Sequence, residues 1–146
     1  MNVQSIARSA ALALVAALTL APSVAQAQSG TSPKFNVPFD FHVGDRAYPA
    51  GEYTVNSGVA PGVVLIRSLN CRHVAAVLTN SVQARRTPDI NKLIFIRYAG
   101  AGTYLRSFWV VGSALGRELL PTKQEVEVAR RANQPEETIV AQSARP

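Results

Sequence analysis

The chain has 146 residues, of which 47% are hydrophobic and 16% are charged, and its formal net charge is +6. A single cysteine, Cys71, excludes a scaffold built on intrachain disulfides. The length suits one domain, so stability must come from burial of one apolar core. The basic excess favours an anionic partner only if it is clustered, and scattered solubilising charge is the simpler interpretation.

Residues 1–27 have the three parts of a secretory signal peptide. Arg8 supplies the positive region, Ala10–Ala21 is a short apolar run, and Ala25–Ala27 is an A-x-A cleavage site. An N-terminal helix of the folded domain is the weaker alternative. We therefore expect an exported product, periplasmic or extracellular, that does not span the membrane once the signal is cleaved.

A linker at residues 28–33 leads into a single β-domain predicted over residues 34–132. Apolar residues occupy every second position of its opening run, namely Phe35, Val37, Phe39, Phe41 and Val43. A period of two indicates a strand with one buried face. Pro38 has no amide hydrogen, so this strand should run along a sheet edge or through a bulge.

Gly44-Asp45 is a residue pair that favours a two-residue hairpin turn. Such a turn places Val43 opposite Arg46, His42 opposite Ala47, and Phe41 opposite Tyr48. The next four residues, Tyr48–Gly51, fit a type I turn. A strand then resumes over Glu52–Val55.

The pattern F-N-V-P-F-D-F-H-V-G-D, followed by P-A-G-E-Y-T-V, resembles an uncharacterised family of small exported bacterial β-proteins. The resemblance continues through the segments V-L-I-R, V-L-T-N, a basic loop and G-R-E-L, at residues 64–67, 77–80, 83–86 and 116–119. It implies an exported β-domain. It implies no activity, ligand or catalytic residue.

Further apolar runs predict strands at Val63–Leu69, His73–Thr79, Lys92–Tyr98 and Thr103–Val111. Between them lie a turn at residues 70–72, a polar, basic loop at 80–91 and a hairpin turn at 99–102. Short strands joined by short turns predict an all-β fold of six to seven antiparallel strands. Such a fold forms a small barrel or a two-layer sandwich.

Two of these runs, Val63–Ile66 and Leu93–Ile96, are apolar at consecutive positions, as expected of strands covered on both faces. In a domain this small, either the C-terminal segment or a partner or ligand would have to cover the second face.

The C-terminal segment carries the helix signal. Thr122–Glu125 matches a capping box, which predicts a short surface helix over about residues 122–132. The composition of residues 133–146 indicates a disordered tail, although Thr138–Ala141 is apolar enough to dock.

Two pairs of side chains are candidates for chemistry. Asp40 and His42 share a strand face and could ligate a metal or act as acid and base, but outward polar positions explain them. Cys71 and His73 lie two residues apart, yet a nucleophilic cysteine needs its base within ~3 Å, so ordinary turn residues are the better interpretation. For Cys71 itself, a buried small hydrophobe is favoured over an exposed thiol able to form a disulfide dimer.

The sequence contains no nucleotide, metal or hydrolase motif. No catalytic residue, metal or cofactor is therefore predicted, and the chain is not expected to be an enzyme.

Three arginines are candidates for an anion site. Val64–Arg67 and Ile94–Arg97 repeat one pattern, and Arg106 lies on a strand expected to pair with the second copy. If these strands are neighbours, Arg67, Arg97 and Arg106 form a patch for a carboxylate, phosphate or acidic sugar. The alternative is that arginines end strands because their stems cover apolar edges.

Two function classes remain. We favour a non-catalytic binding module for a small molecule or a cell-envelope partner. The alternative is a structural component that self-assembles through its strands as a homo-oligomer. Nucleic acid is not an expected partner, because the signal directs the chain out of the cytoplasm.

Overall fold

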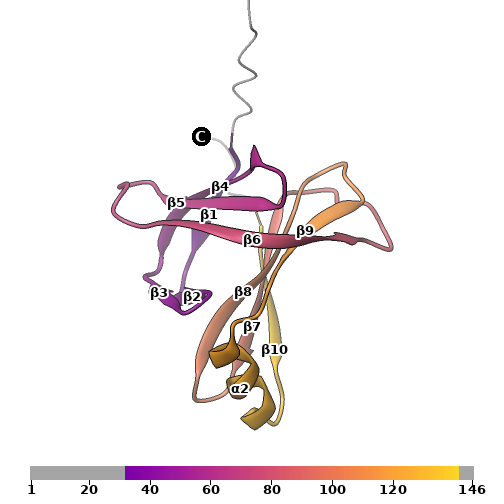
Figure 1. The fold of residues 1–146 in the computed structure, drawn as a ribbon. Helices are drawn as coiled ribbons and strands as arrows, with labels where there is room; N and C mark the ends of the chain where they lie inside the picture. Colours follow the sequence, from indigo (N-terminus) through magenta and orange to yellow (C-terminus); the bar gives the residue numbers. More distant parts are fainter. Residues whose placement is uncertain (1–31, 142–146) are drawn as a thin grey trace, which may run out of the picture. The chain divides into compact units, whose positions relative to one another are not determined.

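The computed structural model describes residues 32–141, which form an all-β fold with one short helix, α2 (Lys123–Arg131) (Figure 1). The strands are β1 (Lys34–Val37), β2 (Phe41–Val43), β3 (Arg46–Tyr48), β4 (Gly51–Ala60), β5 (Val63–Ser68), β6 (Val74–Gln83), β7 (Lys92–Tyr98), β8 (Gly102–Trp109), β9 (Leu115–Leu119) and β10 (Glu136–Ala141). The all-β class with a short C-terminal helix is confirmed, and the expected strand number was too low. The predicted signal peptide lies outside the described residues.

The strands form one hydrogen-bonded sheet that folds over at β6. The first half of β6, Val74–Leu78, pairs with β5, whereas Thr79–Gln83 pairs with β9. As a result, β1, β4, β5 and the first half of β6 make one layer, and β7, β8, β9 and β10 belong to the other (Figure 1).

The second layer is organised around β8. One edge of β8 pairs with β7, and the other pairs with β9 through Ser107–Trp109 and with β2 through Tyr104. The contact between His42 of β2 and Tyr104 is parallel. The expectation of a wholly antiparallel fold was therefore wrong at this one pairing.

The opening run is not one strand, contrary to the prediction. The chain leaves the first layer after Val37, and β2 begins only at Phe41, where it joins β3 and β8. Pro38 cannot donate to a ladder, which explains the break at that point. The prediction that the strand beside Pro38 lies at a sheet edge is confirmed, because β1 is an edge strand.

The hairpin between β2 and β3 has the predicted register. Val43 lies opposite Arg46, His42 opposite Ala47, and Phe41 opposite Tyr48. Gly44 provides the positive φ of 61° that this tight turn requires. The rings of Phe41 and Tyr48 stack with their centroids 5.8 Å apart.

Two strands are longer than predicted. β4 continues to Ala60, beyond the predicted end at Val55, so that a turn at Pro61-Gly62 connects it to β5. β6 continues to Gln83 because its second half pairs with β9, a strand that was not predicted. The basic loop therefore begins at Ala84 rather than at Asn80.

The C-terminal segment is more ordered than the sequence indicated. Thr122 caps α2, with its Oγ1 accepting a hydrogen bond from the Glu125 amide at 3.2 Å, as the capping box predicts. The expected disordered tail is wrong over Glu136–Ala141, which forms β10 along β7. The apolar stretch Thr138–Ala141 does dock, and Val140 is buried.

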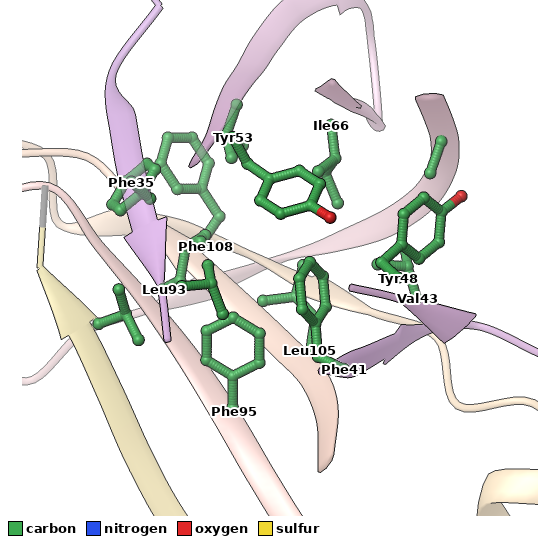
Figure 2. Packing of buried hydrophobic residues seen from close by; sticks show 14 of the residues in the cluster. Phe35, Phe41, Val43, Tyr48, Tyr53, Ile66, Leu93, Phe95, Leu105 and Phe108 are labelled. Carbon is green, nitrogen blue, oxygen red and sulfur yellow. The ribbon is translucent and has the colours of Figure 1, made fainter. Parts of the chain in front are cut away.

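The core lies between the two layers and is rich in aromatic rings (Figure 2). Phe41 meets Tyr53 and Phe95 edge to face, with centroids 5.1 and 5.3 Å apart. Phe35 of β1 meets Phe108 of β8 in the same way at 6.1 Å. These contacts join strands from both layers, so the alternating aromatic residues of the opening run contribute to the core that holds the layers together.

The outer faces of the two layers are covered differently. Over the first layer, Leu78 and Val74 remain 67% and 43% exposed. Tyr98 and Arg106 of the second layer lie against α2, with which they share a pocket. The C-terminal segment therefore covers part of one outer face. This was one of the two predicted alternatives, the other being a partner or ligand.

Across residues 32–141, no helix has both the length and the apolar character needed to cross a membrane.

Candidate functional site

The three predicted arginines do not form one patch. Arg67 lies on β5, which pairs with β4 and β6 and not with β7, so the condition for a shared patch is not met. Arg97 lines a pocket with Asp40 and Thr103 near the β7–β8 turn. Arg106 lines a different pocket beneath α2.

Of the pairs considered for acid, base or nucleophile roles, Asp40 and Cys71 are accounted for by local structure. Asp40 Oδ1 accepts a hydrogen bond from the Ala50 amide at 2.8 Å. Cys71 lies in the turn between β5 and β6 with a φ of 57°, and it is exposed. The expectation of a buried cysteine was wrong, because Cys71 occupies an exposed turn between two strands and not a position in the core.

The more informative site lies beneath α2, on the outer face of β7 and β8. The sheet contributes Tyr98 and Arg106, and the helix contributes Glu125. Arg106 reaches this face through an irregularity in β8. Leu105 lies opposite Phe95 and Ser107 opposite Ile94, which leaves Arg106 as the extra residue of a β-bulge.

Glu125 is the central residue of this site. It is 5% exposed, because the cap at Thr122 fixes the first helical turn with this side chain beneath α2. Its Oε1 lies 3.8 Å from Arg106 Nη1, which is close enough for an ion pair but too long for a hydrogen bond. Oε1 is consequently buried without a hydrogen-bond partner.

The protonation of Glu125 reflects this burial. Burial raises the pKa of Glu125 above its ordinary value of 4.5. The charge of Arg106 and hydrogen bonds from the Thr122 backbone and the Tyr98 side chain lower this pKa without cancelling the effect of burial. Burial, followed by the charge of Glu125, raises the pKa values of Tyr98 and Tyr104, so both phenols stay protonated at neutral pH.

A second buried polar atom without a partner lies on the same face. His42 stacks on Tyr104 with ring centroids 4.7 Å apart, and its Nδ1 has no hydrogen-bond partner. Gly102 leaves the room for this ring, because a Cβ there would lie 3.2 Å from His42 Cε1. Buried polar atoms without a hydrogen-bond partner are uncommon in native proteins. Here His42 Nδ1 and Glu125 Oε1 are two such atoms, and both residues interact with Tyr104.

We call the hollow beside Glu125 the α2 pocket. It has a volume of about 320 Å³, and its lining consists of Tyr98, Arg106, Pro121, Glu125, Val126, Ala129 and Arg130. Its walls are mostly apolar, and two of its polar side chains, Tyr98 and Arg106, contact Glu125. This combination of an apolar hollow with a few placed polar groups is typical of small-molecule sites.

The sequence indicated this site only in part. The capping box identified Glu125 as a first-turn residue, and Arg106 was a candidate site residue. The burial of the Glu125 carboxyl group could not be inferred, because it depends on how α2 docks on the sheet. The β-bulge at Arg106 has no local sequence signal.

Comparison with known proteins finds no matching family model, no matching curated protein and no matching solved structure. Within the described part of the chain, no group of three or more His, Cys, Asp or Glu residues could hold a metal ion. We therefore infer function from the geometry of the α2 pocket.

Proposed function

We propose that this chain is a non-catalytic binding module whose small-molecule site is the α2 pocket. The observation that carries the proposal is the Glu125 carboxyl group, which is buried at the pocket wall with no hydrogen-bond partner for Oε1. Leaving a buried acceptor unpaired costs about 1–3 kcal/mol. A ligand that donates a hydrogen bond to this oxygen would recover that cost.

The composition of the pocket supports binding rather than catalysis. Among its described lining residues there is no thiol, and the phenol of Tyr98 is the one hydroxyl group. Burial keeps that phenol protonated, so it is a poor nucleophile. The signal-like residues 1–27 and the resemblance to exported proteins support a role outside the cytoplasm, in the periplasm or beyond the cell.

The test compares two tryptophan substitutions on α2. Ala129→Trp fills the α2 pocket, whereas Gln124→Trp adds the same side chain at an exposed helix position outside it. We expect small amphipathic compounds, screened by amide chemical-shift changes, to bind the wild-type chain and the Gln124→Trp variant but not Ala129→Trp. Hits that bind Ala129→Trp equally well would place the site elsewhere and refute the proposal.

A second function, self-assembly, is favoured by the uncovered outer face of β5 and β6. Leu78 lies opposite Val63 there and is 67% exposed, with Val74 exposed further along the strand. Exposed apolar faces are typical of protein interfaces. Self-assembly predicts that sedimentation depends on concentration for the wild-type chain and not for Leu78→Lys; a concentration-independent monomer would reject it.

A further inference from the structure

We propose that the α2 pocket binds the cationic end of an amphipathic ligand, an alkylammonium or guanidinium group, with Glu125 as the acceptor. The inference deepens the proposed function and depends on it. It also replaces the anion that the sequence had suggested for Arg106 with a ligand of opposite charge.

The charges around Glu125 favour a cationic ligand over an anionic one. Arg106 Nε lies 3.1 Å from Glu118 Oε1, whereas Arg106 Nη1 lies 3.8 Å from Glu125 Oε1. One guanidinium therefore serves two carboxylates, and Glu118 has the shorter contact. Asp45, in the β2–β3 turn, acts on Glu125 as a third negative charge. This excess of negative charge would repel an incoming anion, whereas a cation would balance it.

Arg130, the other basic residue of the pocket, does not reverse this balance. Its side chain is 71% exposed, and its Nη1 lies 3.4 Å from Glu127 Oε1. Glu127 Oε2 also lies 4.0 Å from Arg131 Nη2, so two arginines share this carboxylate, but the Arg130 charge lies in solvent and is screened there. At the buried end of the pocket, Glu125 Oε1 has no hydrogen-bond partner, and its contact with Arg106 Nη1 is 3.8 Å long.

The remaining walls fit the rest of such a ligand. Tyr98 lines the pocket and meets Tyr104 edge to face with centroids 5.6 Å apart. Neutral phenol rings attract cations through their faces. Pro121, Val126 and Ala129 form an apolar wall that would contact a short alkyl chain. A cationic head with an apolar tail satisfies both parts of the pocket.

The experiment titrates the full chain with three probes of similar size, n-butylammonium, n-butanol and butyrate, and follows amide chemical shifts. We expect n-butylammonium to bind at least about tenfold more tightly than butanol, because a charge-assisted hydrogen bond is stronger than a neutral one. Butyrate should bind most weakly. The shifted resonances should belong to the first turns of α2 and to the adjoining part of β8.

Two glutamine variants isolate the acceptor. Glu125→Gln should reduce n-butylammonium binding to the level of butanol. Glu52→Gln removes an exposed carboxylate on β4, outside the lining of the α2 pocket, and should leave the affinity within about twofold. Dispersed amide spectra check that both variants are folded.

The outcomes separate this inference from the proposed function. Tightest binding by butyrate, or an ammonium preference that survives Glu125→Gln, overturns the cationic ligand but leaves the pocket as a binding site. The cationic ligand is also overturned, and the pocket remains a binding site, if none of the three probes binds but other compounds do and Ala129→Trp abolishes their binding. If no compound of any class binds the α2 pocket, both proposals fail.

Discussion

At the scale of single residues, Glu125 determines how the fold responds to pH. Its pKa is raised in the folded chain, so the folded state binds this proton more tightly than the unfolded state does. The resulting stabilisation is fully present below the ordinary value of 4.5 and is lost as pH rises through the raised pKa.

Glu125→Gln mimics the protonated carboxyl group at every pH. We therefore expect the free energy of unfolding of the wild-type chain, relative to Glu125→Gln, to fall as pH rises from about 4 to about 8. Urea unfolding of both proteins across this range measures the difference. A difference that instead moves in favour of the wild-type chain would mean that Arg106 outweighs burial and that the pKa is depressed.

Gly116 shows how one residue without a side chain permits a strand pairing. It lies opposite Trp109 in the β8–β9 ladder, and an added Cβ would lie 2.5 Å from Trp109 Cε3. The indole cannot move away freely, because its Nε1 donates to Ser107 Oγ at 2.9 Å.

Gly116→Ala should therefore lower the free energy of unfolding by about 1–3 kcal/mol. Gly58→Ala is the matched control. Its Cβ would lie 3.3 Å from Asn56 Oδ1, which accepts a hydrogen bond from the Gly58 amide at 2.7 Å. A small shift relieves this contact, so a change under about 1 kcal/mol is expected. Equal effects in chemical denaturation would contradict the proposed clash.

At the scale of elements, β10 forms where the sequence predicted a disordered tail. Substitution of two adjacent residues tests whether this strand docks on the sheet. Val140 is 8% exposed, whereas Ile139 on the opposite face is 53% exposed. Val140→Ala should cost about 1.5–2.5 kcal/mol of unfolding free energy, through lost burial and a small cavity. Ile139→Ala should cost less than about 0.5 kcal/mol. Two negligible values in urea titrations would indicate that this segment does not dock.

Which elements the sequence predicts depends on the distance between the residues that decide them. The β2–β3 hairpin and the cap of α2 are set by residues within a few positions of one another, and both were predicted. The separation of β1 from β2, the strand β9 and the docking of β10 depend on pairing with distant strands. The Glu125 site belongs to this second group, because its burial requires α2 to dock on β8.

At the scale of the described β-domain, stability is expected to be uneven. β8 pairs with three strands and carries buried core residues, whereas Glu125 is the buried residue of α2. The helix should therefore open without the sheet. We expect its amides to exchange with deuterium at least about a hundredfold faster than those of β8. Equal protection would show that α2 and the sheet unfold as one unit.

Native mass spectrometry shows whether the α2 pocket of the purified chain holds a small molecule. The full chain and its Ala129→Trp variant are purified in parallel and measured with reductant over a tenfold range of concentration. The account predicts a monomer that carries a co-purifying mass in the wild-type chain and none in the variant. A bare oligomer, or a bound mass that Ala129→Trp retains, would contradict it.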